Sequence, residues 1–340
     1  MRKTSRVTLR DIAAELNCTV NTVSRALNDK GDISPSMKDR VRQAATRMGY
    51  IHNGIAASLR SGKTGVVAVV VDAVSNLHFS IVVHQIEARM REIGKSTMIL
   101  CTDCDMAIER DALTAAISLR VDGIILCPAF GGEENQRLAL TSGIPTVLIG
   151  RRGLPDLDAA ICDDEQGGYL AARHLIALGH KKLMYLGASM PVSSEVERRA
   201  GFMRAVAEAG PEFALATHSV SDMLGLHPAE ARALWPDGAA TGAFVFNDIY
   251  AYALINALAG KELRVPGDLS VVAFDNISEH YDFMAPLTTI GVSAQPMYDA
   301  AVDMLIARMD GEERPPTCAV MPVRVCNPDA TCRAPGARGA

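Results

Sequence analysis

From Gly65 to about residue 274, short apolar runs alternate with longer stretches whose apolar residues recur at helical spacing. The run at 65–72, Gly-Val-Val-Ala-Val-Val-Val-Asp, is apolar at nearly every position, which is typical of a strand buried on both faces of a parallel sheet. Strands are expected at 65–72, 96–101, 122–127, 145–149, 182–186, 241–246 and 269–274, and helices at 80–93, 109–119, 167–178 and 197–209, with another ending at Ala259. This alternation predicts the α/β class with doubly wound parallel sheets, and its two series predict two lobes.

The first fifty residues have a different organisation, with two short amphipathic segments joined by a tight turn. Thr8 is expected to cap the first helix, with Asp11 as its reciprocal partner three residues later. The helical pattern breaks at Asn17, and Thr19 is expected to cap the second helix. This is the layout of a helix-turn-helix, whose second helix lies in the major groove of DNA.

A third helix is expected after this pair. Ser34 is a favourable cap, Pro35 suits the first helical position, and Gly49 suits the end. The N-terminal segment is therefore predicted to be a three-helix helix-turn-helix domain with a small core.

Charge is divided unevenly along the chain. Residues 1–65 contain twelve Lys and Arg against five Asp and Glu, a net charge of +7, whereas the remainder contains 22 against 34, a net charge of −12. A basic segment that coincides with a helix-turn-helix favours phosphate contact, and an acidic remainder is repelled by DNA. The pattern indicates a DNA-binding head on an acidic body.

Three stretches of the head resemble the lactose/galactose repressor (LacI/GalR) family of bacterial transcription regulators. They are 22–28 (Thr-Val-Ser-Arg-Ala-Leu-Asn), 49–53 (Gly-Tyr-Ile-His-Asn) and 56–60 (Ala-Ala-Ser-Leu-Arg), the last being similar to the family's hinge segment. Weaker similarity continues to about Arg324. The resemblance implies that the body has the two-lobed architecture of periplasmic binding proteins, with a ligand cleft between lobes that the chain crosses three times.

The resemblance also implies domain boundaries. We expect a helix-turn-helix domain at 1–51, a hinge helix and linker at 52–64, and an effector-binding and dimerisation domain at 65–340. Crossings are expected near 161–163, 290–292 and 320–322, which places 65–161 and 292–320 in lobe one and 162–290 and 321–340 in lobe two.

DNA-contacting roles in the head follow from the same resemblance. Val20, Asn21 and Arg25 would read base edges, since asparagine pairs with adenine, arginine with guanine, and valine packs on a thymine methyl. Backbone contacts are implied for Thr8, Thr19, Thr22, Ser24, Asn28 and Tyr50, although Thr8 and Thr19 are also explained as caps. In the hinge, Asn53, Ala56 and Leu59 would meet the minor groove, with Leu59 as a wedge between base steps.

Side chains at the ends of the expected strands indicate a ligand site. Ligands of doubly wound sheets bind outside the carboxyl ends of the strands, where His78, Phe79, Cys127, Arg151 and Asn247 are expected. The resemblance adds Arg198, in the family's Arg-x-x-Gly-Phe pattern, and Asp275, where the family often places a ligand-binding aspartate. An aspartate, an asparagine and an arginine around one cleft, with an aromatic ring on one side, suit a polyhydroxylated ligand.

Simpler structural explanations exist for several of these side chains. Asn247 could only cap the following helix, Phe79 could belong to the core, His78 could be merely exposed, and Arg151 could form a salt bridge between lobes. Gly150 stands where the family commonly has an acidic or amide residue, which leaves the identity of the effector open.

Composition and motifs argue against several classes of protein. No apolar run approaches the ~20 residues of a membrane span, and no apolar leader follows Met1, so we expect a cytoplasmic protein without membrane contact. The eight cysteines are expected to be free thiols, and neither a metal nor a cofactor is expected. The segment 61–64, Ser-Gly-Lys-Thr, lacks the upstream glycine of a phosphate-binding loop, and motifs of dinucleotide-binding proteins, hydrolases and zinc proteases are missing.

These observations predict a sequence-specific DNA-binding transcription regulator, a repressor of metabolic genes controlled by a small-molecule effector, and not an enzyme. A homodimer would place two heads on the half-sites of a pseudo-palindromic operator. Residues 327–340 lack the apolar heptads that make some family members tetramers. The alternative is a sugar-binding protein of transport or chemotaxis without a DNA function.

Overall fold

The computed structural model describes residues 7–50, 62–221, 224–235, 240–259, 263–292 and 297–336. The chain divides into two compact units, residues 1–64 and residues 65–340, which we call the head and the body. The predicted hinge contacts Asn53, Ala56 and Leu59 lie outside the described residues.

In its described part, the head contains the helices α1 (Leu9–Glu15), α2 (Val20–Leu27) and α3 (Pro35–Met48). The predicted caps are confirmed. Thr8 and Asp11 form a reciprocal capping box on α1, the Thr19 hydroxyl accepts from the Thr22 amide on α2, and Ser34 caps α3, which ends at Gly49 with a left-handed backbone. The core between the helices consists of small buried side chains, namely Ile12, Ala13, Val23, Ala26, Val41, Ala44 and Ala45.

The body contains two six-stranded sheets. The first has the order β11 (Cys318–Met321), β5 (Asp158–Cys162), β4 (Thr146–Ile149), β3 (Gly123–Leu126), β1 (Val66–Val71) and β2 (Ser96–Cys101), with all neighbours parallel. The second has the order β12 (Val323–Cys326), β10 (Thr288–Val292), β9 (Ser270–Phe274), β8 (Gly242–Val245), β6 (Lys182–Ala188) and β7 (Ala214–Val220), parallel except for β10 and β12.

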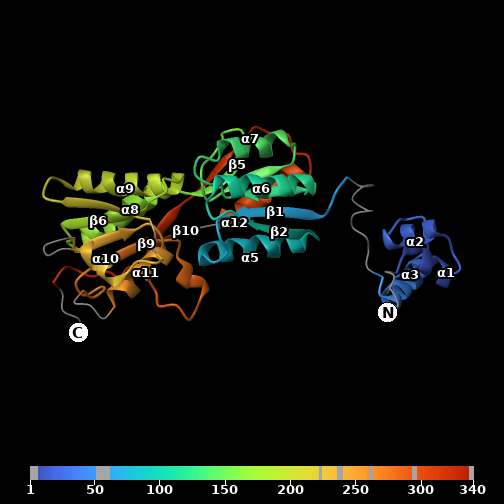
Figure 1. Ribbon diagram of the computed structural model, residues 1–340, viewed down its shortest axis with the longest axis horizontal. Helices are drawn as coiled ribbons and strands as arrows, with labels where there is room; N and C mark the ends of the chain where they lie inside the picture. The colour runs from blue at the N-terminus through green and yellow to red at the C-terminus, as the bar shows by residue number, and fades with distance from the viewer. Residues whose placement is uncertain are drawn as a thin grey trace. The chain divides into compact units, whose positions relative to one another are not determined.

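Helices cover both faces of each sheet. In lobe one, α5 (Leu77–Glu92) and α12 (Met297–Met309) pack on one face, and α6 (Met106–Ser118) and α7 (Glu133–Thr141) on the other. In lobe two, α8 (Asp164–Ala177) and α9 (Ser193–Ala209) lie on one side of the sheet, and α10 (Pro228–Ala233) and α11 (Asp248–Leu258) on the other (Figure 1). The predicted α/β class with two doubly wound lobes is confirmed.

The order of the described elements shows that the chain passes between the lobes at three places. β5 ends at Cys162 in the first sheet, and α8 begins at Asp164 against the second. β10 ends in the second sheet and is followed by α12 on the first, and β11 of the first sheet is followed directly by β12 of the second. Both lobes are therefore built from discontinuous segments of the chain.

Several elements of the body were not predicted from the sequence, among them α7, β7 and α12. β7 is an edge strand with mostly exposed side chains, so it lacks the continuous apolar run of the buried strands. α12 packs on the lobe that the chain left at β5. Its place in the fold depends on the crossing of the chain from lobe two back to lobe one, and the local sequence does not reveal this crossing.

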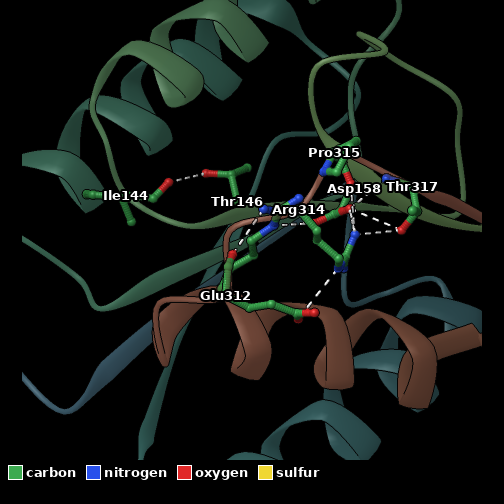
Figure 2. Close-up of polar contacts among 8 residues, drawn as sticks. Ile144, Thr146, Asp158, Glu312, Arg314, Pro315 and Thr317 are labelled. Carbon is green, nitrogen blue, oxygen red and sulfur yellow. Dashed lines mark hydrogen bonds and ion pairs between the residues drawn. The ribbon is translucent and has the colours of Figure 1, made fainter.

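A buried carboxylate fastens this returning segment to lobe one. Asp158 at the start of β5 is 2% exposed. It accepts hydrogen bonds from Arg314 Nη1 and the Thr317 amide, each at 2.7 Å (Figure 2), and from Arg308 Nε at 2.7 Å. Burial alone would raise the pKa of Asp158, but these donors outweigh it and lower the pKa below the ordinary value. The ionised carboxylate thus links β5 to the end of α12 and the segment before β11.

Candidate DNA-binding surface and ligand cavity

The residues predicted to read bases lie on the outer side of α2. Val20 is 41% exposed, Asn21 is exposed, and Arg25 lies one turn after Asn21. Val23 and Ala26 on the inner side of the same helix are fully buried against the other helices. The apolar inner side thus fixes the helix in the head and leaves the outer side free for a partner.

Four of the residues predicted to contact the DNA backbone, Thr19, Thr22, Ser24 and Asn28, lie in α2 or cap it, and several have partners within the head. Thr19 and Thr22 share a hydrogen bond of 2.9 Å between their hydroxyls. The side-chain Nδ2 of Asn28 donates to the Ser24 carbonyl at 2.6 Å. Asn28 and Tyr50 line one shallow groove, together with Leu27, Arg42, Ala45 and Thr46.

In the body, a cavity of about 350 Å³ lies between the lobes. All seven side chains predicted to bind a ligand line it: His78, Phe79, Cys127 and Arg151 from lobe one, and Arg198, Asn247 and Asp275 from lobe two. The strand ends and helix starts of both sheets therefore bring together residues that lie far apart in the sequence.

Arg198 on α9 is the central charge on the lobe-two wall. Its Nε donates to Asp164 Oδ1 at 2.7 Å and its Nη1 to the Phe246 carbonyl at 2.8 Å. The guanidinium also lies 3.5 Å from the centroid of the Phe274 ring. Burial disfavours its charge, but Asp164 and Asp275 outweigh this and raise the pKa of Arg198, so the side chain stays cationic.

Arg151 lies on the lobe-one wall of the cavity. Its ion pair differs from the one expected from the sequence. Arg151 forms a two-point pair with Asp72, with Nη1 to Oδ1 at 3.1 Å and Nη2 to Oδ2 at 2.5 Å, and also donates to the Pro128 carbonyl. Asp72 follows β1 and so belongs to the same lobe. The alternative of a salt bridge between lobes was therefore wrong, because the partner follows β1 of the same sheet, which β3 separates from β4.

Asp275 enters the cavity from a strained turn after β9. Its φ of 115° and that of Asn276, 54°, are both in the left-handed region. Its carboxylate lies 3.7 Å from Arg198 Nη2 and 3.8 Å from His78 Nδ1. Because His78 lies in the first turn of α5 in lobe one, the polar groups of Asp275 and His78 approach each other between the lobes.

The strained turn is supported from behind by Asp248, which is fully buried. Its Oδ2 accepts from the Ile277 amide at 2.8 Å and its Oδ1 from the Thr289 hydroxyl at 2.5 Å. Burial raises the pKa of Asp248 well above its usual range. The carboxyl holds the backbone that presents Asp275.

The other simple explanations are partly correct. Asn247 does cap α11, since its Oδ1 accepts from the Tyr250 amide at 2.9 Å, and it lines the cavity as well. Phe79 packs against the core while it borders the cavity. His78 is partly buried and lies edge-on to Phe79, with ring centroids 5.3 Å apart, so it is not merely exposed. Burial raises the pKa of Cys127, which keeps it a neutral thiol.

Several cavity residues were not among the predicted contacts. The polar ones are Asp72, Ser75, Asp103, Cys104, Ser194 and Tyr250, and Phe246 adds a further aromatic ring. Asp72 follows β1 directly and Asp103 is the second residue after β2, so the strand-end rule could have found them. Ser194 lies in the first turn of α9, where only the position of α9 in space brings it to the site.

No helix in the described part of the chain is long and apolar enough to cross a membrane. Among the same residues, no group of three or more His, Cys, Asp or Glu side chains is placed to hold a metal ion.

Two parts of the chain match known families. Residues 8–53 match bacterial regulatory proteins of the lacI family, and residues 172–329 match the periplasmic binding protein-like domain. The HTH-type transcriptional regulator DegA of Bacillus subtilis (strain 168) is 32% identical over 305 residues, which cover 88% of this chain and 89% of DegA. The chain belongs to the LacI family.

Other comparisons agree with this assignment. The HTH-type transcriptional repressor PurR of Vibrio vulnificus (strain CMCP6) is 31% identical over 313 residues, 90% of this chain and 93% of PurR. The lac repressor dimer bound to operator and the anti-inducer ONPF has a TM-score of 0.78 at 23% identity, covering 96% and 100% of the two chains. A LacI family transcriptional regulator from Enterococcus faecium with bound ribose has a TM-score of 0.66 at 27% identity, covering 79% and 99%.

The protein is thus a DNA-binding transcription regulator of the LacI family, and its relatives are regulators rather than enzymes. The match of the head removes the alternative of a sugar-binding protein without a DNA function.

Proposed function

We propose that this LacI-family protein is a repressor of metabolic genes whose affinity for a pseudo-palindromic operator changes when a sugar or sugar derivative binds between the lobes. The observation that carries this proposal is the convergence of seven side chains from both lobes on one cavity. The repressor PurR from Vibrio vulnificus and the ribose-bound regulator from Enterococcus faecium support it by similarity.

The chemistry of the cavity suits a ligand with several hydroxyl groups. Asp275 and Asn247 provide acceptors, Arg198 and Ser194 provide donors, and the ring of Phe79 can cover an apolar sugar face. A volume of about 350 Å³ lies at the small end of ligand pockets, which are typically about 300–1,000 Å³. A monosaccharide-sized effector is the best fit.

Ligand binding can reach the head through contacts between the lobes. His78 and Asp275 meet across the cavity, and Arg152 after β4 donates its amide to Ser193 Oγ at 2.8 Å and its Nε to Glu197 at 2.6 Å. A ligand that inserts between these groups changes the angle between the lobes. Because the hinge segment joins lobe one at Gly65, such a change moves the point at which the head is attached.

A homodimer is supported by an exposed aromatic patch. Phe283 is 80% exposed and lies beside Tyr281, with ring centroids 5.4 Å apart. Aromatic side chains are enriched at protein–protein interfaces. We assign it to the contact between two copies, which together would place two heads on the half-sites of the operator.

The DNA contacts remain part of the proposal. Val20, Asn21 and Arg25 would read bases, and helix N-termini with their caps Thr8 and Thr19 would approach phosphates. Leu59 of the hinge would enter the minor groove. A protein that acts on chromosomal operators would work in the cytoplasm.

A thermal-shift screen of the full chain against ribose, other sugars, sugar acids and nucleobases tests the ligand assignment. A ligand at 100 times its Kd stabilises the body by about 2.7 kcal/mol, so at least one sugar should raise the melting temperature. A shift with nucleobases and none with sugars would contradict the sugar assignment. The stabilising compound should then change operator affinity in a gel-shift or fluorescence assay, and unchanged affinity would contradict the regulatory role.

A further inference from the structure

An acidic residue holds the predicted guanine-reading arginine. Arg25 Nε donates to Asp32 Oδ2 at 2.8 Å, and Arg25 Nη2 lies 2.6 Å from Asp32 Oδ1. Asp32 lies in the turn between α2 and α3. The two side chains are 43% and 54% exposed, so the pair lies on the surface of the head. Two parallel contacts of this kind fix the plane of the guanidinium as well as its position.

This pairing leaves the other edge of the arginine available. A guanidinium has five N–H donors in a rigid plane, and Asp32 uses the edge formed by Nε and Nη2. The remaining edge, formed by Nη1 and Nη2, can donate two parallel hydrogen bonds to O6 and N7 of a guanine. One arginine can therefore be held by Asp32 and read a base at the same time.

The energetics of the pair argue against a purely stabilising role. An exposed ion pair contributes little to folding, because water screens it and two side chains lose freedom. A carboxylate on a DNA-facing surface also weakens attraction to phosphates. The neighbouring Asp29 instead contacts Lys38 and Arg42 of α3, so it braces the turn itself. Asp32 faces α2.

We propose that Asp32 is a positioning residue that determines base specificity by holding the guanidinium of Arg25 in the orientation that reads a guanine. The inference rests on the proposed base-reading role of α2. Without Asp32, the flexible arginine can turn to a phosphate, which is a contact that carries no sequence information. Asp32 thus lowers the general affinity of the head for DNA and increases its discrimination at one base pair.

The test measures base preference with the full chain and a library of DNA duplexes randomised across the binding site. Wild type should prefer guanine at one position of each half-site by about 5- to 150-fold, the range for a bidentate contact. Asp32→Ala should lose most of this preference and bind a scrambled duplex more tightly. Asp32→Asn, which removes the charge with little change of shape, should also weaken the preference.

The matched control is Asp39→Ala, which removes one exposed acid from the head, on α3, near Arg42. It should raise affinity for the scrambled duplex and keep the guanine preference. In an Arg25→Ala background, Asp32→Ala should have no further effect on base preference. Thermal melting of each variant checks that the head stays folded.

Two results would overturn the inference. If Asp32→Ala keeps the same guanine preference as Asp39→Ala, Asp32 acts only through its charge. If the guanine preference of Asp32→Ala is stronger than that of Asp39→Ala, Asp32 keeps Arg25 away from DNA. Failure of the base-reading role itself would give a different result. The wild-type protein would then select no sequence, or Arg25→Ala would keep the guanine preference.

Discussion

The head and the body of this regulator place their functional side chains differently. On α2 of the head, Val20 and Asn21 are exposed on the outer side of the helix. In the body, Arg151, Arg198 and Asp275 have largely buried side chains, and each contacts a charged group of the protein. DNA brings its own phosphates and base edges to the head, whereas charges inside a cavity need protein partners before any ligand arrives.

The ion pairs of the two regions differ in the same way. Glu15 and Arg47 of the head are 2.6 Å apart but about half exposed or more, and such surface pairs contribute about 0–1 kcal/mol. The carboxylate of Asp158 in the body is almost completely buried among two arginines and a backbone amide. The head therefore depends on its small core and its helix caps, and the body also depends on buried polar contacts.

The largest effect is expected from breaking such a contact in the body. Asp158→Ala should lower the free energy of unfolding of the body by about 3 kcal/mol, the lower end for a broken buried pair, because Arg308 and Arg314 are partly exposed and can hydrate. Denaturant unfolding of the full chain measures this. Asp303→Ala, which removes an exposed partner of Arg89, is the control and should change stability by under about 1 kcal/mol. Equal effects of both variants would contradict the difference between the regions.

The same carboxylate predicts how acid affects the body. The pKa of Asp158 in the folded protein is lowered from its ordinary value of 3.8. Its contribution is therefore fully present above 3.8 and is lost as the pH falls through the lowered value. The stability difference between wild type and Asp158→Asn should be constant from neutral pH to about pH 5 and shrink in stronger acid. A difference that grows towards low pH would contradict an ionised Asp158.

A smaller effect is expected at the exposed surface of the head. Asn21→Ala should reduce discrimination at particular base positions by about 1–3 kcal/mol while leaving the stability of the head unchanged. The measurement is the affinity of Asn21→Ala and of wild type for operator duplexes with single base substitutions. If the variant loses the same affinity for every sequence, Asn21 contacts the DNA backbone instead of a base.

The smallest effect concerns the cap of α2. Thr19→Ala removes the hydroxyl that accepts from the Thr22 amide and should destabilise the head by about 1 kcal/mol, without any change in the body. Amide hydrogen exchange reports the two units separately. Thr19→Ser keeps the hydroxyl and should behave as wild type. Loss of stability in the body would mean that the two units do not unfold independently.

The sequence predicted features that depend on neighbours along the chain. Thr8 with Asp11, and Ser34 with Pro35 and Gly49, define helix ends within a few residues, and the structure confirms them. Five of the seven cavity side chains were found because parallel strands share one carboxyl edge, and the family resemblance added Arg198 and Asp275.

Contacts between distant segments could not be predicted. Arg151 pairs with Asp72, and Asp248 supports the turn of Asp275 through Thr289. Both contacts depend on the order of the strands in the sheets, which brings residues from separate strands together. Periodicity and charge along the chain carry no information about such pairings.

The central claim is that a ligand beside Asp275 controls the affinity of the head for DNA. The most direct test measures operator affinity with and without the stabilising sugar, and sugar affinity with and without operator. Both ratios should be equal, and a typical coupling is about 5- to 150-fold. Asp275→Asn, which tolerates the left-handed backbone while removing the charge, should bind operator like wild type without sugar and should no longer respond at the wild-type sugar concentration. Unequal ratios, or an unchanged response in Asp275→Asn, would contradict the account.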